Sequence, residues 1–316
     1  MEIWADLMKQ KIALVTGANG TIGRYVARAL AAREWHVLGL GHGGWQAAEQ
    51  TEWGLSSWDE GDVTLTSLRA LELRPRLIVH CAGSGAVGPS ITAPHTDFQR
   101  TVETTAAVAE FLRVDCPGAV LVYPSSAAVY GIADCMPMLE GMPRRPVSPY
   151  GFHKKIAEDL VVEHARLFGL NAAVVRLFSI YGEGLRKQLL WDACQRLRRG
   201  EILFSGTGGE TRDWLHVTDA AALLIRAGEN ASPACPVVNG GAGEAVTLAD
   251  FLGHLFVCWG RDDAPRFTGS GRLGDPEHYQ ADVRAARAWG WAPAVGWQSG
   301  VARYVDWFKR EMAITR

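Results

Sequence analysis

Short apolar runs rich in β-branched residues alternate with helix-like stretches through the first half of the chain. The runs do not switch between apolar and polar residues, which is typical of parallel strands that are buried on both faces of a sheet. Such alternation predicts an α/β fold with a Rossmann-type, doubly wound parallel sheet. The expected strands are residues 11–16, 36–40, 77–81, 119–123 and 172–178, and the expected helices are residues 22–33, 64–73, 97–113 and 152–168.

The rhythm loosens after residue 178, where glycine clusters separate single helices and short strands. We therefore expect a dinucleotide-binding domain over residues 1–178, completed by about residues 212–240. A smaller substrate-binding lobe is expected from residues 179–211 and 241–316. A chain of 316 residues is long enough to bury the core of each part.

Charge and composition exclude several classes of partner. The formal net charge is −2, so no basic field is present to hold nucleic acid or an anionic membrane surface. No apolar run approaches the roughly 20 residues that a membrane-spanning helix needs, and residues 1–10 lack the apolar core of a secretion signal. The six cysteines are scattered with no CxxC pair, which indicates reduced thiols in a cytoplasmic protein and neither disulfides nor a metal site.

A glycine-rich turn follows the first expected strand and opens the first expected helix. Glycines at this spacing permit a tight turn, close approach of the backbone to a pyrophosphate, and close packing of helix on strand. The free N–H groups at the start of the helix then bind the phosphate. A plain structural turn is the alternative, but the position after the first strand favours dinucleotide binding. The residues expected to bind the cofactor here are Gly17, Asn19, Gly20, Thr21, Ile22 and Gly23.

Tyr150 and Lys154 form a YxxxK pair at the start of another helix-like stretch. The i, i+4 spacing places the phenol and the ammonium group on one helix face. A nearby cation favours the phenolate, so we expect Lys154 to lower the pKa of Tyr150 from its ordinary value of about 10. A phenol tuned in this way exchanges a proton with an alcohol or a carbonyl near neutral pH. Taken alone, YxxxK is more often a solvated pair, and only its combination with the other motifs favours this role.

Ser125 and Ser126 lie at the end of the fourth expected strand, in the segment YPSSAAVYG. Ligands of open α/β sheets bind beyond the carboxyl ends of the strands, which is where these hydroxyls fall. Ser126 is therefore expected to hydrogen-bond the reacting oxygen of a substrate, with Ser125 beside it. The alternative is that both serines only cap the following turn.

Together these motifs resemble the extended short-chain dehydrogenase/reductases, the NAD-dependent epimerase/dehydratase family, over nearly the whole chain. TGANGTIG is similar to that family's TGxxGxxG, SSAAVYG to its catalytic serine segment, and YGFHK to its catalytic YxxxK. RLFSIYGEG, which begins at Arg176, resembles the family's RxFNxYGPG. TRDWLHVTD, which begins at Thr211, resembles the RDFVHVxD stretch of members that act on nucleotide sugars.

The resemblance implies a Ser/Tyr/Lys mechanism on a sugar carried by a nucleotide. In it Tyr150 is the acid/base, Lys154 orients the nicotinamide ribose and tunes Tyr150, and Ser126 holds the substrate oxygen. The residues that match cofactor contacts of the family are Asp62 and Val63, for adenine, and Cys81, Ala82 and Gly83, in the segment beside the cofactor.

Two arginines are implied to bind the diphosphate of the substrate. Arg212 stands in TRDWLHVTD and Arg272 in GRLGD. The planar fork of a guanidinium group suits a diphosphate geometrically. For Arg212 the alternative is a surface ion pair with Asp213 or Glu210, and for Arg272 a structural and a functional role are rated evenly.

The second expected strand lacks the acidic residue that NAD-preferring members place near its end to bind the ribose 2′-hydroxyl. Gly41 stands at that position. Without a carboxylate there, a 2′-phosphate is not repelled, and His42 or Arg24 is expected to contact it. No arginine follows the strand directly, so the sequence favours NADP over NAD only slightly.

Ala127 and Ala128 follow Ser126, where the family's 4,6-dehydratases carry Asp-Glu and its sugar-acid decarboxylases a Glu. Both chemistries lose a needed acid/base group, which leaves oxidation or reduction at one carbon. NADPH-dependent reduction of a 4-keto sugar is the leading interpretation, and NAD-dependent 4-epimerisation of a nucleotide sugar is the alternative. Ser179 takes a substrate-contacting position where many members have asparagine, so the specific sugar stays open.

Two further interpretations assign the chain a function other than the modification of a nucleotide sugar. One is a non-catalytic nucleotide-binding regulator that kept the fold, and the presence of Ser126, Tyr150 and Lys154 argues against it. The other is a reductase for a carbonyl compound without a nucleotide, which the RDW segment disfavours.

A homodimer is expected, because family members commonly pair two helices of each chain into a four-helix bundle. The corresponding stretches here are residues 97–113 and 152–168. Burial of these faces within a single chain is the alternative. The apolar residues that extend beyond one core face are Val102, Val108 and Phe111 in the first stretch and Ile156, Leu160 and Val161 in the second.

Overall fold

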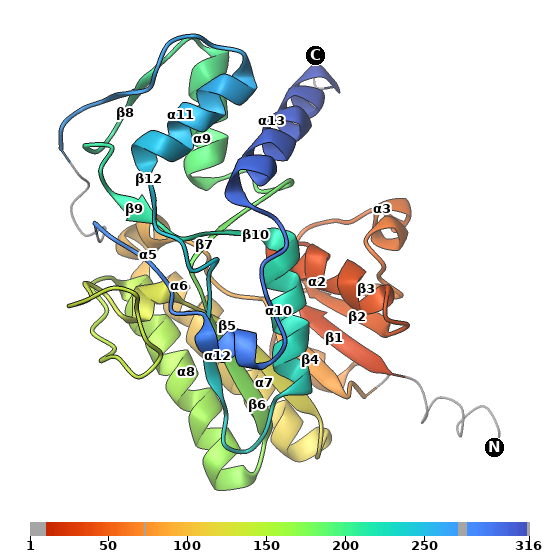
Figure 1. Ribbon diagram of the computed structural model, residues 1–316. Coiled ribbons are helices and arrows are strands. Elements are labelled where there is room, and N and C mark those ends of the chain that lie inside the picture. The colour runs from red at the N-terminus through yellow and green to blue at the C-terminus, as the bar shows by residue number, and fades with distance from the viewer. Residues whose placement is uncertain (1–10, 73, 271–276, 315–316) are drawn as a thin grey trace. The chain divides into compact units, whose positions relative to one another are not determined.

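The computed structural model describes residues 11–72, 74–270 and 277–314. These residues form two compact units, each built from several segments of the chain (Figure 1). The first unit contains the described residues up to Gly131, together with Pro143–Arg176 and Ala221–Val238. The second contains Ile132–Met142, Leu177–Ala220 and the described residues from Asn239 onward. No helix in these ranges is long and apolar enough to cross a membrane.

A seven-stranded sheet forms the centre of the first unit. Its strands are β1 (Ile12–Thr16), β2 (His36–Gly41), β3 (Ser57–Glu60), β4 (Leu77–His80), β5 (Val120–Ser126), β6 (Asn171–Leu177) and β11 (Val237–Gly240). They lie in the order β11-β6-β5-β4-β1-β2-β3, and β1 pairs in parallel with both β2 and β4. The strand order therefore reverses between β1 and β4, the point at which open α/β sheets bind ligands. The expected Rossmann-type fold class is confirmed.

Helices pack on the sheet because its strands are apolar on both faces. The helices of this unit are α2 (Thr21–Ala31), α3 (Ala47–Glu52), α4 (Leu65–Arg69), α5 (Val87–Thr92), α6 (Pro94–Phe98), α7 (Thr104–Asp115), α8 (Pro149–Phe168) and α10 (Val217–Glu229). Of these, α2, α7, α8 and α10 contact the strands. Leu14, Ile78 and Leu121 belong to a fully buried core shared with α4, α7 and α8. At Gly228 of α10, an added Cβ would lie 3.3 Å from Leu77 and 3.4 Å from Val122. The unalternating apolar runs thus serve two packed faces.

The helix expected over residues 97–113 is present, but its hydrogen bonding is not α-helical throughout. A π-helical turn, η1 (Gln99–Glu103), separates α6 from α7. The hydroxyl of Thr104 donates to the carbonyl of Arg100 at 2.7 Å, and that of Thr105 to the carbonyl of Thr101 at 2.6 Å. Threonine hydroxyls that bond to the preceding turn compete with the backbone ladder and favour such irregular turns.

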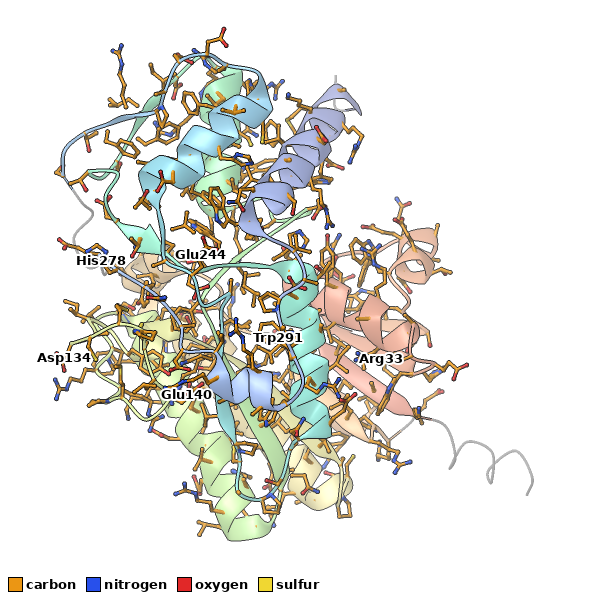
Figure 2. All side chains as sticks on the ribbon, viewed as in Figure 1. Arg33, Asp134, Glu140, Glu244, His278 and Trp291 are labelled. Carbon is orange, nitrogen blue, oxygen red and sulfur yellow. The ribbon has the colours of Figure 1, made fainter. Side chains whose placement is uncertain are left out.

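The second unit consists of short strands and four helices. Its elements are β7 (Ser179–Tyr181), α9 (Gln188–Arg198), β8 (Leu203–Phe204), β9 (Thr211–Arg212), β10 (Trp214–His216), β12 (Val246–Thr247), α11 (Leu248–Trp259), β13 (Arg266–Phe267), α12 (Arg284–Ala288) and α13 (Trp297–Ile314). Its core is aromatic, with the rings of Trp214 and Phe251 stacked at 3.9 Å. Trp291 donates its indole N–H to the carbonyl of Asp219 at 3.1 Å (Figure 2). Large aromatic surfaces thus hold a unit that has no large sheet.

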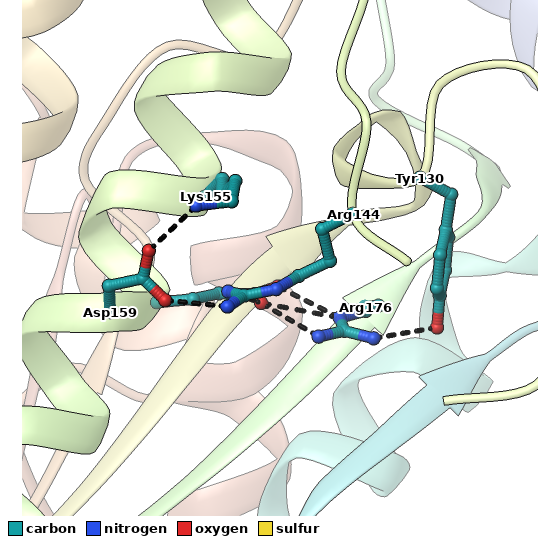
Figure 3. Close-up of polar contacts among 6 residues, drawn as sticks. Tyr130, Arg144, Lys155, Asp159 and Arg176 are labelled. Carbon is teal, nitrogen blue, oxygen red and sulfur yellow. Dashed lines mark hydrogen bonds and ion pairs between the residues drawn. The ribbon is translucent and has the colours of Figure 1, made fainter. Parts of the chain in front are cut away.

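A buried ion pair joins α8 to β6 in the first unit (Figure 3). Arg176 donates from Nε to Oε1 of Glu158 at 3.0 Å and from Nη2 to Oε2 at 2.9 Å. Its Nη1 donates to the hydroxyl of Tyr130 at 2.9 Å, and Arg144 adds a second cation at 3.1 Å from Glu158. Glu158 and Arg176 are 1% and 4% exposed, so the charges depend on each other for compensation. Asp159, by contrast, lies on the exposed side of the helix.

Arg176→Met is expected to lower the free energy of unfolding by about 3–5 kcal/mol, because it leaves the Glu158 carboxylate buried with only Arg144 beside it. The matched change Asp159→Asn removes an exposed pairing on the same helix and should cost less than about 1 kcal/mol. Urea unfolding followed by tryptophan fluorescence measures both. A loss for Arg176→Met no larger than that for Asp159→Asn would contradict the structural role of the pair.

Candidate active site

The glycine-rich turn lies at the point where the strand order reverses. Gly17 has a φ of 65°, and a Cβ there would lie 2.7 Å from the backbone N of Ala82, which follows β4. A Cβ at Gly23 would lie 2.2 Å from the carbonyl oxygen of Gly17. Side chains at these two positions would clash with the backbone, so only glycine fits at Gly17 and Gly23.

The start of α2 carries the features of a phosphate site. Its N-cap is Gly20, and no side chain caps the first turn. The backbone N–H groups there, with the positive end of the helix dipole, suit an anion. Gly17, Asn19, Gly20, Thr21, Ile22 and Gly23 are brought together in this turn, as expected. The glycine cradle therefore fits the pyrophosphate of a dinucleotide.

The end of β4 adjoins this turn. The hydroxyl of Thr16 lies 2.7 Å from Nδ1 of His80 and accepts the N–H of Ala82 at 3.2 Å. Burial, reinforced by the charge of Lys154, lowers the pKa of His80 to about 3, so its ring is neutral. Burial likewise raises the pKa of Cys81 to about 12 and keeps the thiol protonated. The segment of Cys81, Ala82 and Gly83 thus presents uncharged groups beside the phosphate turn.

The structure brings together the three residues assigned to catalysis. Ser126 ends β5, and an interaction of its side chain with Tyr150 opposes the rise in the pKa of the phenol. Tyr150 stands in the first turn of α8, which Ser148 caps by accepting the N–H of Gly151 at 3.2 Å. One turn later Lys154 lies 6.0 Å from the Tyr150 ring centroid. The buried ammonium group of Lys154 donates to the carbonyl of Pro124 at 3.0 Å.

Burial has the largest effect on the pKa values of Tyr150 and Lys154. It raises the pKa of Tyr150, an interaction with Ser126 lowers it, and the charge of Asp97 raises it further. The expectation that Lys154 lowers the pKa of Tyr150 in the protein alone is wrong, because burial is the largest influence and raises the pKa. Burial also lowers the pKa of Lys154 to about 8, although nearby anionic groups oppose the change. Tyr150 therefore holds its proton at neutral pH, and Lys154 remains mostly charged.

Two residues that the sequence analysis did not identify contact this region. Asp97 of α6 accepts a hydrogen bond at 2.6 Å from Nδ1 of His153, which lies inside the YxxxK segment. Asp97 is 3% exposed, and its charge raises the pKa values of both Tyr150 and Lys154. The hydroxyl of Ser90 also accepts the backbone N–H of Tyr150 at 3.0 Å. No spacing rule relates residues this far apart in the chain, so only the packing of α5 and α6 on α8 reveals them.

Ser125 lies in β5 beside Ser126 but differs from it in environment. Its side chain is 3% exposed, and its hydroxyl has no hydrogen-bond partner among the described residues. The hydroxyl of Ser126, by contrast, accepts the N–H of Ala128 at 3.2 Å, and its side chain affects the pKa of Tyr150. Only Ser126 is therefore linked to the phenol.

The substrate residues expected in the second unit are only partly described. Ser179 begins β7, and its backbone N–H donates to the carbonyl of Asp213. Arg272 lies outside the described residues. Arg212 lies in β9, where Nη1 donates to the carbonyls of Thr211 at 2.8 Å and Glu277 at 3.2 Å.

The alternative ion pairs of Arg212 are absent from the described part of the chain. The carboxylate of Asp213 accepts the backbone N–H groups of Ala242, Gly243 and Ala281 at 2.5–3.0 Å. Glu210 accepts N–H groups of its own turn. Arg212 thus keeps a guanidinium charge that no described carboxylate balances.

The adenosine side of the turn contains the remaining expected residues. His42 and Asp62 face each other at 2.8 Å, both exposed, and Val63 is buried. Arg24 donates from Nη2 to the backbone carbonyl and the side-chain oxygen of Asn19, each at 2.9 Å. Over the described ranges, no cluster of three His, Cys, Asp or Glu side chains is arranged to hold a metal ion.

Known proteins that are similar to this chain in sequence and in fold belong to one family of enzymes. A model of the NAD dependent epimerase/dehydratase family matches residues 13–240. The UDP-glucose 4-epimerase of Mycolicibacterium smegmatis is 29% identical over 313 residues, which cover 94% of this chain and 98% of that protein. MoeE5, solved with NAD and either UDP-glucuronic acid or UDP-glucose, is 28% identical with a TM-score of 0.83, over 95% of this chain and 99% of MoeE5. A UDP-glucose-4-epimerase from Stenotrophomonas maltophila has the same fold, with a TM-score of 0.88 at 22% identity over 97% of this chain and 100% of that one.

Proposed function

The chain belongs to the NAD-dependent epimerase/dehydratase family, and from this membership we propose that it is a UDP-sugar 4-epimerase that retains and recycles NAD. It is an enzyme of the short-chain dehydrogenase/reductase type that acts on a nucleotide-linked sugar. The 4-position of the sugar, the uridine nucleotide and the resident NAD are the proposed part.

The relatives favour the epimerase over the NADPH-dependent 4-keto reductase that the sequence analysis placed first. The UDP-glucose 4-epimerase of M. smegmatis is similar along almost its whole length, and MoeE5 binds NAD together with UDP-sugars. The slight preference for NADP has no support from these proteins. The prediction of NADP rested only on the missing carboxylate at Gly41, the end of the second strand.

The arrangement of Ser126 at the end of β5 with Tyr150 and Lys154 in the first turns of α8 is the observation that carries the proposal. It offers one acid/base, while Ala127 and Ala128 add no second proton-transfer group. Elimination and decarboxylation need such a group. Removal and return of hydrogen at a single carbon does not, because one phenol serves both directions.

The chain's own residues supply the proton transfers of this reaction. Bound NAD supplies a hydride acceptor that later returns the hydride, together with a cationic ring. An added cation favours the phenolate, so Tyr150 gives up its proton more readily when that charge is near. Tyr150 takes the proton of the sugar hydroxyl as the carbonyl forms and returns it when the carbonyl is reduced. Ser126 donates a hydrogen bond to the same oxygen, and Lys154, anchored on Pro124, is proposed to hold the nicotinamide ribose.

The diphosphate of the substrate is proposed to bind Arg212, whose guanidinium group no described carboxylate neutralises. The carbonyls of Thr211 and Glu277 orient one edge of the group, and the ring of Tyr279 lies 5.6 Å from its central carbon. A held guanidinium fork binds phosphate oxygens at a low entropic cost. Ser125, Ser179 and Arg272 stay predicted substrate contacts.

The compartment and the oligomeric state are proposed on separate grounds. The six cysteines are free thiols, which suits the reducing cytoplasm. For the homodimer, Val102, Val108, Phe111 and Val161 give no support because they are buried in the first unit's own core. The support comes from α8, where Phe152 and Ile156 are 52% and 38% exposed one turn apart.

The purified protein is expected to interconvert UDP-glucose and UDP-galactose without added nucleotide, and Tyr150→Phe should reduce turnover by about 10²–10⁴-fold because it removes the acid/base. NAD content, measured after denaturation, should stay the same in the variant. Lys155→Ala, a change at a half-buried residue on the same helix, is the control and should retain activity. A requirement for stoichiometric NADPH would support the 4-keto reductase interpretation instead. Near-normal turnover of Tyr150→Phe would show that Tyr150 is not the acid/base.

Arg212→Ala should raise the KM for a UDP-sugar more than it lowers kcat, because grip on the diphosphate is mostly uniform binding. UDP alone should protect the wild type against heat more than it protects the variant. Arg226→Ala, which removes an arginine paired with Glu229 on the surface, should leave both measurements unchanged. Equal protection of the wild type and Arg212→Ala by UDP would refute the assignment.

The chain is expected to run as a dimer in light scattering at micromolar concentration, and Phe152→Asp with Ile156→Asp should convert it to monomers. Charges placed in an apolar contact cost more than the contact gains. A wild-type mass equal to one chain would count against the homodimer.

A further inference from the structure

The end of β2 is tightly packed at the position where many dinucleotide sites use an acidic side chain. Gly41 is buried, and a Cβ on it would lie 3.2 Å from the ring of Trp58 and 3.3 Å from the backbone of Gly17. Close packing of the strand end against the glycine turn therefore keeps this position small. Discrimination at the ribose 2′ position must come from other residues.

Arg24 is tied to this strand end through Asn19. The side-chain amide of Asn19 donates to the carbonyls of His42 at 3.4 Å and Gly43 at 3.3 Å. Arg24 in turn donates twice to Asn19, each time at 2.9 Å. Since the 2′-hydroxyl of the adenosine ribose lies at the end of β2 in folds of this kind, Arg24 is the cation next to it.

Arg24 is also fixed in place and balanced by charge. Glu49 of α3 lies 3.6 Å from Nη1. The rings of Trp45 and Trp53 lie 5.4 Å and 5.2 Å from the central carbon of the guanidinium group. Cation–π contacts and the Asn19 bonds restrict the side chain, which is only 20% exposed. A guanidinium group held in this way by a carboxylate is not available to a phosphate.

We propose that Glu49 replaces the missing strand-end carboxylate and, by holding Arg24, makes the protein select NAD over NADP. A 2′-phosphate brings almost two negative charges to the site and would meet Glu49 there. NAD brings only a hydroxyl, which hydrogen-bonds without a change in charge. The His42–Asp62 pair acts in the same direction but is 71% and 80% exposed, so water screens it more strongly. This inference rests on the proposed function for the identity of the resident cofactor.

Competition between the two cofactors tests the proposal without a sugar substrate. The full chain is equilibrated with equal excesses of NAD and NADP, freed of unbound nucleotide, and the bound nucleotides are quantified by mass spectrometry. The wild type should retain NAD almost alone. Glu49→Gln should shift the bound ratio toward NADP by about tenfold or more, the effect of one charge-assisted hydrogen bond. Arg24→Ala added to Glu49→Gln should abolish that shift.

Two further variants make the result specific. Glu52→Gln removes an equal charge from the end of the same short helix and should leave the ratio unchanged. Asp62→Asn should shift it less than Glu49→Gln. An unchanged ratio in Glu49→Gln, an equal shift in Glu52→Gln, or a larger shift in Asp62→Asn would each overturn the proposal. Because only binding is measured, an epimerase that keeps its activity while Glu49→Gln has no effect refutes this inference alone, and a chain that selects NAD without epimerising UDP-sugars refutes only the function.

Discussion

The buried ion pair between Glu158 and Arg176 fixes the helix that carries Tyr150 and Lys154, two of the residues proposed to act in catalysis. A buried pair offsets its desolvation cost only when its hydrogen bonds are complete, and Arg176 completes them with Glu158 and Tyr130. Lys154 precedes Glu158 by one helical turn, so the two side chains lie on one face of α8. The contact that ties α8 to β6 thereby also fixes the rotation that directs Lys154 to the carbonyl of Pro124. The geometry of the proposed catalytic residues therefore depends on a charge pair that has no proposed part in proton transfer.

Buried charge also controls the protonation of the site. Burial pulls the pKa of Tyr150 up and that of Lys154 down, and Asp97 raises both. The anion therefore keeps Lys154 charged while it opposes the phenolate. His153 partly compensates Asp97 from within the YxxxK segment itself. Tyr150 is thus held as an acid until a further positive charge favours its base form, which is the property an alternating acid/base needs.

The same principle appears at the cofactor's adenosine end. The sequence identified Arg24 and His42 as candidate phosphate ligands because it contains no acid at Gly41. In the folded chain each has a carboxylate partner, Glu49 or Asp62, contributed by a segment that follows β2. Under the proposed selection of NAD, a basic residue that the sequence offers as a phosphate ligand is instead held by its carboxylate partner. Partners of this kind depend on how loops pack, and no periodicity encodes them.

The amino-acid sequence by itself predicted the layered sheet and its glycine-rich phosphate turn. It also selected Ser126, Tyr150 and Lys154 as the candidate catalytic residues. Apolar runs, glycine spacing and the i, i+4 pair are local patterns, and local patterns dictate local geometry. Tertiary structure alone decided what surrounds them: the raised pKa of Tyr150 and the partners of Arg24 and Asp97. These depend on burial and on contacts between residues distant in the chain. Desolvation and Coulomb interactions are set by what lies within a few ångströms in space, and the order of residues along the chain does not specify that.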